Sequence, residues 1–243
     1  MKRINNQSGF TIIELLLAMA FISVLLVGVA VTVIQISSIY NKGLTMKSVD
    51  QVGRDVSTDI RATLAQSQPF SVEANSSSSG LREIPRQDQN GSGGGRLCTG
   101  TYTYVWNYGS AIVSGNSVNK YSSSDDEIRF ARVHDNGGQY CADPTKAIEK
   151  HDATELLSAG DKDLAIQSFS IKQLANDSNL SQALYRVVIE IGTNNQDALQ
   201  QKQSLDTMDT TCKPPNDDSS LQDYCAVNQF DFTATAGNRG GAS

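Results

Sequence analysis

The chain has 243 residues, and its 26 acidic and 20 basic residues give a net charge of −6. This balance argues against a broad electrostatic interface with nucleic acid, because phosphates are bound by clustered Lys and Arg. The length suits one long helix and one domain of roughly 170 residues.

The amino-terminal segment joins a short basic leader to a long apolar run. Lys2 and Arg3 lie in the leader, and nearly unbroken apolar residues occupy positions 10–33. A helix of that length spans about 36 Å, enough to cross a bilayer core of about 30 Å. The two cations predict a cytoplasmic amino end. A secretory signal peptide would have a shorter apolar region of about 7–15 residues and a small-residue cleavage site after it, and the sequence has neither.

One carboxylate, Glu14, lies inside the apolar run. An ionised side chain at the centre of a bilayer costs on the order of 2.5–3.5 kcal/mol, and less near the interface. Glu14 is therefore expected to have a partner. A plain membrane anchor remains an alternative, but it gives no reason for this residue.

The sequence Gly9-Phe10-Thr11-Ile12-Ile13-Glu14-Leu15 resembles the class III signal of type IV prepilins and type II secretion pseudopilins. In that family, a membrane aspartyl peptidase cleaves after the glycine and methylates the new amino terminus. The resemblance implies cleavage between Gly9 and Phe10, N-methylation of Phe10, and pairing of Glu14 with the amino group of a neighbouring subunit. The implied partners are other pilin subunits, the prepilin peptidase, an inner-membrane assembly platform, and the membrane before assembly.

The resemblance also implies the type IV pilin fold. This is an α+β fold in which a long N-terminal helix, half hydrophobic and half amphipathic, packs on an antiparallel β-sheet. The expected organisation is a leader at 1–9, a transmembrane and filament-core helix at 10–36, an amphipathic helix at 37–66, a Ser/Gly-rich loop at 67–97, a β-rich extracellular head at 98–236, and a flexible tail at 237–243. Gly28, inside the apolar run, permits a close helix approach or marks a point of local melting on assembly.

After the apolar run, hydrophobic residues recur at three- and four-residue intervals, at Met46, Val49, Val52, Val56, Ile60 and Leu64. This spacing predicts one helix over residues 11–65, which ends before Pro69 and packs its apolar stripe on a sheet. The Ser- and Gly-rich stretches at 75–80 and 90–96 predict mobile loops. The glycine tract has no following Lys-Ser/Thr, so a nucleotide site is not expected.

Five strands are predicted in the rest of the chain. The first alternates four aromatic residues with polar or smaller ones and forms either core packing or an exposed binding platform; the aromatic residues are Tyr102, Tyr104, Trp106 and Tyr108. The others cover residues 127–133, 164–174 and 185–191, and the region of Phe230 and Phe232. A change of phase predicts a bulge near Gln167 and Ser168. A helical turn is expected at 153–158, and the short strands predict an antiparallel sheet.

The four cysteines all lie in the part expected outside the cytoplasm, at Cys98, Cys141, Cys212 and Cys225. An even number in an oxidising compartment favours disulfides. No C-x-x-C occurs, and His134 and His151 give no ligand spacing, so no metal site is expected. Three connectivities are open. The short loop favours Cys212–Cys225, and therefore Cys98–Cys141, although spacing does not determine contact.

A second, looser resemblance covers about a third of the chain. A Gly-Asp-led stretch at 159–169, a Tyr-Arg-Val strand at 185–189 and a late segment at 225–230 are similar to larger minor pilins of the PilW-like group and to J-type minor pseudopilins. No catalytic motif occurs. Two acidic groups could offer oxygen ligands to calcium but have no EF-hand order, and a solvated turn is the simpler interpretation; they are Asp125, Asp126 and Glu127, and Asp217, Asp218 and Asp223.

Together these features predict a structural subunit, minor-pilin-like, of a type IV pilus or related filament, with no enzymatic activity and no cofactor. The alternatives are a type II secretion-type pseudopilin and an adhesive or DNA-capturing pilin. The expected location is the cytoplasmic membrane, in a single pass with a cytoplasmic amino end, followed by an extracellular or periplasmic filament.

Overall fold

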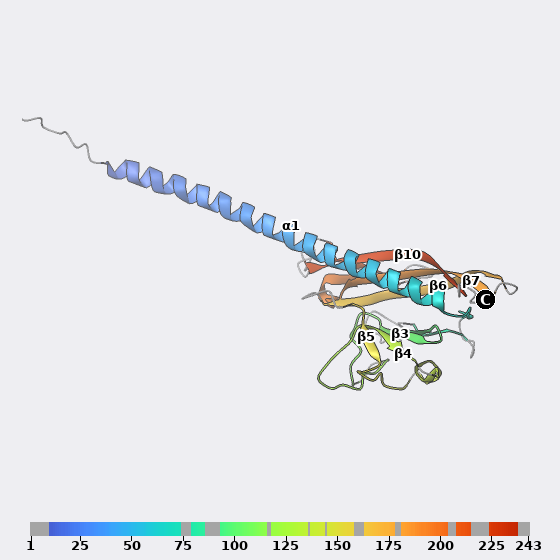
Figure 1. Cartoon of the computed structure of the whole chain (residues 1–243). Coiled ribbons are helices and arrows are strands. Elements are labelled where there is room, and N and C mark those ends of the chain that lie inside the picture. Colours follow the sequence, from blue (N-terminus) through green and yellow to red (C-terminus); the bar gives the residue numbers. More distant parts are fainter. Residues whose placement is uncertain are drawn as a thin grey trace, which may run out of the picture.

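The computed structural model describes residues 10–73, 79–85, 93–115, 118–135, 137–143, 145–157, 163–177, 181–203, 208–214 and 224–237. It consists of one long helix that leads into a β-rich head (Figure 1). The leader with Gly9, the acidic residues Asp217, Asp218 and Asp223, and the tail after residue 237 lie outside the described residues.

Helix α1, Ile12–Gln66, is continuous over 55 residues, close to the expected 11–65 (Figure 1). It ends at Ser67, whose backbone is extended (φ −81°, ψ 159°) and whose N–H and hydroxyl both donate to the Leu64 carbonyl, at 3.0 and 2.8 Å. Its first buried residue is Thr45. We call residues 10–44 the stalk, and the part of the chain from Thr45 onwards the head.

The head contains a three-stranded antiparallel sheet in the order β10-β7-β6. Its strands are β6 (Leu164–Asp177), β7 (Gln182–Thr193) and β10 (Val227–Ala236). Helix α1 lies along β10, and a Cβ added to Gly53 of the helix would come within 1.9 Å of the Phe230 ring. Glycine at this position lets the helix approach the strand closely enough to pack on Phe230.

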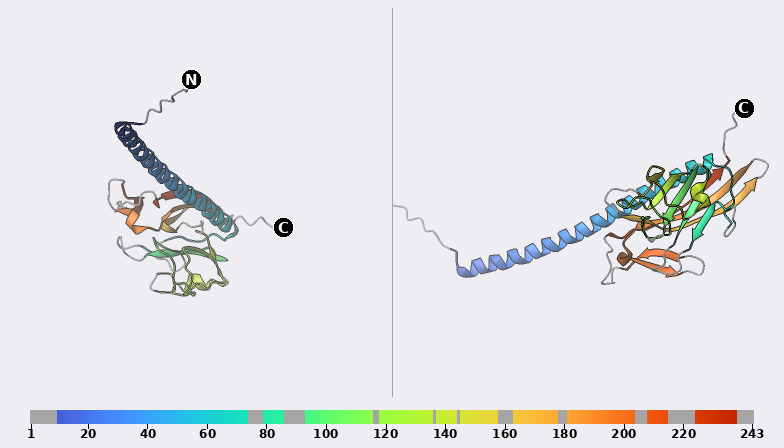
Figure 2. Two further views of the ribbon diagram at one scale, coloured as in Figure 1. Left: turned by 90° about the vertical axis from the view of Figure 1, so that its left-hand side faces the viewer. Right: turned by 90° about the horizontal axis from the view of Figure 1, so that it is seen from below.

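A second, five-stranded sheet follows the chain order. Its strands are β1 (Leu81–Ile84), β2 (Gly94–Cys98), β3 (Tyr102–Asn107), β4 (Phe130–His134) and β5 (Ala153–Glu155). A parallel bridge between Tyr108 and Ile166 connects the end of β3 to β6. The hairpin of β8 (Leu199–Gln203) and β9 (Met208–Cys212) stands apart from both sheets (Figure 2), and two short helices, α2 (Gln139–Ala142) and the 3₁₀ helix η1 (Gln196–Ala198), complete the described elements.

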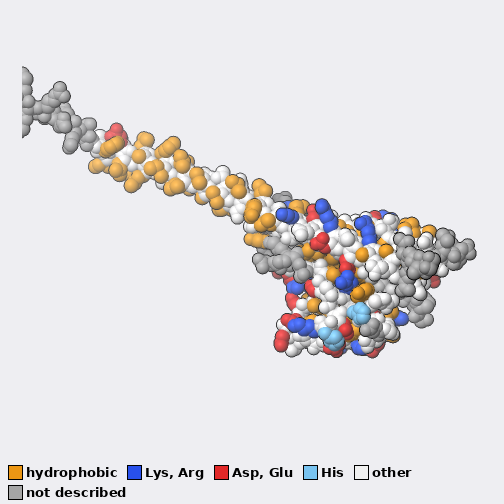
Figure 3. Space-filling model, viewed as in Figure 1, with side chains coloured by type: hydrophobic (Ala, Val, Ile, Leu, Met, Phe, Trp, Pro, Cys, Tyr) orange, Lys and Arg blue, Asp and Glu red, His pale blue; other side chains and the backbone are white. Residues whose placement is uncertain are grey.

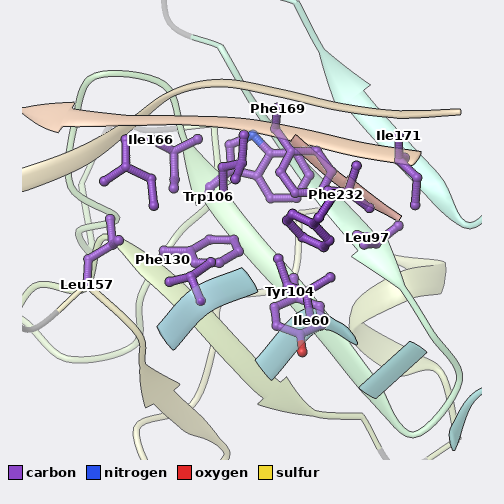
Figure 4. Packing of buried hydrophobic residues seen from close by; sticks show 14 of the residues in the cluster. Ile60, Leu97, Tyr104, Trp106, Phe130, Leu157, Ile166, Phe169, Ile171 and Phe232 are labelled. Atoms are coloured by element: carbon purple, nitrogen blue, oxygen red, sulfur yellow. The ribbon is translucent and has the colours of Figure 1, made fainter. Parts of the chain in front are cut away.

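The main core lies between α1 and the inner faces of the two sheets (Figure 4). Trp106 packs on Phe169 with ring centroids 4.3 Å apart, and Tyr104 stacks near Phe130 at 5.7 Å. Tyr104, Trp106 and Tyr108 are all buried, so the aromatic face of β3 is core packing and not an exposed binding platform.

A smaller core covers the outer face of the five-stranded sheet. Val105 and Val133 from the sheet contact Tyr140 and Ile148 from the segment after β4. The buried Arg96 secures that segment: its guanidinium donates to the carbonyls of Tyr140 at 2.6 Å, Asp143 at 3.1 Å and Lys146 at 3.0 Å, and to Asn119 Oδ1 at 2.7 Å. The five-stranded sheet is therefore covered on both faces.

Two disulfides join the pairs Cys98–Cys141 and Cys212–Cys225, with Cα–Cα distances of 5.7 and 5.8 Å. This is the pairing expected from the sequence. The first disulfide ties the end of β2 to α2 and so fastens the outer covering segment to the sheet next to Arg96.

The described strands differ from the expected ones in three places. Strands β1 and β2 lie in the region 67–97 that the composition predicted as loop. Residues 153–155 form strand β5, not a helical turn, because they pair with β4 while the Glu155 carboxylate accepts the N–H groups of Arg129 and Phe130. There are also two main sheets where one was expected. The predicted bulge is confirmed by a register shift between Ile166 and Ser168.

Candidate functional site

The stalk projects from the head with its apolar side chains uncovered (Figure 3). No residue of α1 before Thr45 is buried, and after Glu14 the next charged residue is Lys42. The helix is the only one in the described residues that is long and apolar enough to cross a membrane. An apolar surface of this size is unfavourable in water, so it is expected to be buried in lipid or against the helices of other subunits.

Glu14 is fixed at the start of this surface by a capping box with Thr11. The Thr11 backbone N–H and hydroxyl both donate to Glu14 Oε2, at 3.1 and 3.0 Å, while the Thr11 hydroxyl oxygen accepts the Glu14 N–H at 3.3 Å. This reciprocal arrangement satisfies two of the amide groups that a helix start leaves unpaired. The spacing Thr-x-x-Glu in the sequence is the signal for this capping box, which is a second role for Glu14 beside its charge.

The capping box occupies one carboxylate oxygen and leaves the other available. Both Thr11 hydrogen bonds end on Oε2, and within the described residues Oε1 accepts none. Phe10, which is 88% exposed, lies one residue before the helix cap. A cation that approaches the end of the stalk would therefore meet an exposed, oriented oxygen in an apolar setting, where Coulomb attraction is stronger than in water.

Gly28 in the middle of the stalk has no steric role within its own chain. A Cβ added there would meet no atom within 4 Å. Glycine inside a helix costs roughly 1 kcal/mol relative to alanine, so the residue weakens the isolated helix without improving its packing. The two expectations for Gly28, close helix approach and local melting on assembly, both depend on contacts with other subunits, so they stay predictions.

A polar network fixes the buried half of α1 against β3 and β4. Tyr104 donates its hydroxyl proton within a cluster of Asp59 Oδ2 and Thr63 Oγ1, both at 2.7 Å, and Arg132 forms an ion pair with Asp59 Oδ1. Burial raises the pKa of the Tyr104 hydroxyl far above its ordinary value, so this group remains protonated. The network attaches the carboxyl-terminal part of α1 to β3 and β4 within the head.

The acidic residues considered for calcium are otherwise engaged where they are described. Asp126 pairs with Lys150, which holds the pKa of that carboxyl below its usual value, and Glu127 pairs with Arg129. No group of three or more His, Cys, Asp or Glu side chains within the described ranges is arranged to hold a metal ion.

An open groove of about 820 Å³ lies at the stalk end of the head, and no sequence pattern predicts it. We call it the acidic groove; it is lined by Gly109, Ser110, Ala111, Glu127, Asp163, Thr193, Asn194, Asn195, Asp197 and Tyr224. Arg129 bridges Glu127 and Asp163, which leaves a net negative charge with Asp197 included. The lining residues come from five separate stretches of the chain, so no local motif predicts the groove. These are 109–111 after β3, Glu127 before β4, Asp163 before β6, 193–197 at the end of β7, and Tyr224 before β10.

Comparison with known proteins gives one match. Residues 4–30 match the model of the prokaryotic N-terminal methylation motif. No curated protein and no solved structure matches the chain. The match covers residues 4–9 of the leader, the capping box of Thr11 and Glu14, and the stalk as far as residue 30. Together with a 55-residue helix packed on antiparallel sheets, it indicates a protein of the type IV pilin and pseudopilin family.

Proposed function

We propose that this protein is a minor-pilin-like structural subunit of a type IV pilus or related filament. Prepilin peptidase cleaves it between Gly9 and Phe10 and methylates Phe10. The stalk then passes from the cytoplasmic membrane into the filament core, where the Glu14 carboxylate pairs with the amino group of a neighbouring subunit. The head lies outside the cytoplasm, and the inner-membrane assembly platform inserts the subunit.

The observation that carries this proposal is the uncovered stalk with its single oriented carboxylate. An apolar helix covered on no side is suited first to lipid and then to a bundle of like helices. The free Oε1 of Glu14 supports pairing with an amine, and the methylation motif at residues 4–30 supports how that amine arises. The two disulfides support an oxidising compartment for the head.

A minor position in the filament is favoured by the size of the head, because a bulky head crowds a tightly wound shaft. Glu14 argues against a place at the extreme tip, where no earlier subunit would supply an amine. The looser sequence similarity to the PilW-like group and to J-type minor pseudopilins agrees with a minor subunit. A secretion pseudopilus shares every one of these features and is the alternative assembly; an adhesive or DNA-capturing role would require binding by the head itself.

The test is mass spectrometry of the amino terminus in filaments sheared from cells. The expected result is a peptide that begins with N-methyl-Phe10, recovered from wild-type filaments. A Glu14→Ala variant should be cleaved normally, accumulate in the membrane and be depleted from the sheared fraction. The isosteric Glu14→Gln variant separates charge from shape and should behave like Glu14→Ala.

Two results would refute the proposal. One is an intact Met1, or an amino terminus beyond residue 36, in the mature protein. The other is recovery of Glu14→Ala in filaments at the wild-type level, since a plain membrane anchor would not need the carboxylate.

A further inference from the structure

We propose that three cations on the uncovered face of α1, Lys47, Arg54 and Arg61, dock on carboxylates at the stalk end of a neighbouring pilin head. We call these residues the basic stripe. The inference rests on the proposed function, and it specifies which surface of the head contacts the next subunit.

The basic stripe follows from helix geometry. Its members are seven residues apart, which is close to two helical turns, so they share one face at intervals of about 10.5 Å. All three are exposed, and the uncharged, exposed residues Gln51 and Thr58 lie between them. The buried stripe of α1 that begins at Val49 lies on the opposite face. In Figure 3, Lys and Arg side chains lie along the part of α1 that crosses the head.

The described part of the chain forms no ion pair with the basic stripe. Within the described ranges Lys47 and Arg54 form no ion pair, and the Arg61 guanidinium lies 4.7 Å from the centroid of the Phe232 ring. Four other cations of the head do form ion pairs with carboxylates; they are Arg129, Arg132, Lys150 and Arg186. Of the nearby acids, Asp50 accepts a hydrogen bond from Asn228 at 2.6 Å.

The position of the stripe points to a neighbouring subunit. The stalk and this face belong to one continuous helix, and the sheets cover only its opposite side. When stalks bundle, the uncovered side of α1 is the side that neighbours can approach. Subunits in a filament all point the same way, so each contact joins two different surfaces.

The acidic groove has the complementary charge for such a contact. Strand β10 runs in the same direction as α1: Asn228 at its start contacts Asp50, and Gly237 after its end donates to Ser67 at 2.8 Å. The groove residues that follow β7 therefore lie at the stalk end of the head. In the proposed contact, this end of one head lies against the α1 face of the next subunit, and opposite charges there would fix the register of the two subunits.

A nucleic acid or an anionic bilayer fits the stripe less well. Both present a dense array of phosphates and require many clustered cations. Here the cations are far apart, and Asp50 and Asp55 lie on the same helix close to Arg54. A protein surface with a few separated carboxylates matches this pattern better.

The experiment uses the full-length protein in cells that assemble filaments. A photo-reactive benzophenone amino acid replaces Gln51, an uncharged residue between Lys47 and Arg54 of the basic stripe. Crosslinked peptides from sheared filaments are then identified by mass spectrometry. In parallel, Lys47→Glu with Arg54→Glu is compared with a matched control, Lys120→Glu with Lys172→Glu, which changes two other exposed cations by the same total charge.

We expect crosslinks from position 51 to a carboxylate-bearing segment of a pilin head, either this chain or another subunit. The stripe variant should enter filaments at least about fivefold less than wild type, because like charges in an interface repel, and the control should enter normally. Crosslinks only to DNA or lipid, no crosslinks, normal entry of the stripe variant, or equal loss in the control would overturn the inference. If any of these results occurs while entry into filaments still depends on Glu14, only the docking inference fails and the proposed function stands. If entry does not depend on Glu14, both the proposed function and the docking inference fail.

Discussion

At the scale of single residues, Thr11 decides how Glu14 is presented. It gives the carboxylate two hydrogen bonds and accepts one from the Glu14 N–H. Thr11→Val removes the hydroxyl but keeps the shape, and it should lower the filament-to-membrane ratio of the mature protein roughly fivefold, the factor that corresponds to a lost cap of about 1 kcal/mol. Thr11→Ser should behave like wild type. Immunoblots of sheared and membrane fractions measure the ratio, and equal ratios for Val and Ser would show that orientation by Thr11 is unimportant.

Arg96 is the residue on which the outer layer of the head depends. Burial lowers the pKa of its guanidinium to about 10, so it stays charged at neutral pH and needs its four hydrogen bonds. Arg96→Met removes the hydrogen-bond donor from the buried Tyr140 carbonyl and from the part-buried carbonyls of Asp143 and Lys146. It should reduce the free energy of unfolding by roughly 3 kcal/mol. Arg96→Lys should fall between Met and wild type, because it keeps the charge and part of the bonding.

Thermal unfolding of the full-length protein in detergent measures these differences. The exposed Arg54→Met serves as the control and should unfold like wild type. An Arg96→Met variant that unfolds at the wild-type temperature would mean that the segment after β4 is held by its other contacts alone.

At the scale of elements, the pairing of β7 with β10 carries a pH-dependent contact. Arg186 forms an ion pair with Asp231 across the two strands, and its hydrogen bonds hold the pKa of that carboxyl below the ordinary 3.8. A lowered pKa in the folded state gives stability that is present above the unfolded value and is lost as the pH falls through the folded value. Because the pair is exposed, the effect is small.

The Arg186→Gln variant tests this contact. Its free energy of unfolding should fall below that of wild type at about pH 6, and the two curves should converge as the pH drops below about 4. Urea unfolding at several pH values measures the difference, and Asp231→Asn should reproduce it. A gap that persists unchanged at about pH 2 would show that Arg186 acts through packing and not through charge.

The sequence predicted the elements in which hydrophobic residues recur at regular intervals. The apolar run and the stripe after it predicted α1 to within a residue at each end, and the phase change near Gln167 predicted the bulge in β6. The capping box was also present in the sequence as Thr-x-x-Glu. What these signals share is that each depends on residues a few positions apart, so a local pattern is sufficient.

Strand β2 did not follow from the sequence, because its glycines are explained by a partner far along the chain. A Cβ on Gly95 would lie 2.4 Å from the Trp106 indole, which packs across the paired position. The glycines therefore make room for the largest core side chain, whereas composition alone suggests a flexible linker. The acidic groove did not follow from the sequence for the same reason: five separate chain segments meet there, and none of them carries a recognisable motif by itself.

At the scale of the whole molecule, the stalk and the head differ in how their apolar surfaces are covered. The stalk is uncovered on every side and depends on lipid or on other subunits, whereas the five-stranded sheet of the head is covered on both faces by its own chain. Assembly through the stalk can therefore proceed without rearranging the head. The two parts are connected by one continuous helix, whose head portion is attached to β3 and β4 by the polar network of Asp59, Tyr104 and Arg132.

This division predicts that the two disulfides have unequal and local effects. Cys98–Cys141 closes a span of 43 residues and Cys212–Cys225 one of 13. In the chain-entropy model their removal costs about 4 and about 3 kcal/mol. Replacing Cys98 and Cys141 by Ala should speed amide hydrogen exchange in the segment after β4, while the buried turns of α1 around Val56 and Ile60 keep their protection. Exchange that accelerates equally in both regions would show that the outer layer and the helix unfold as one unit, and that the head has no separable cover.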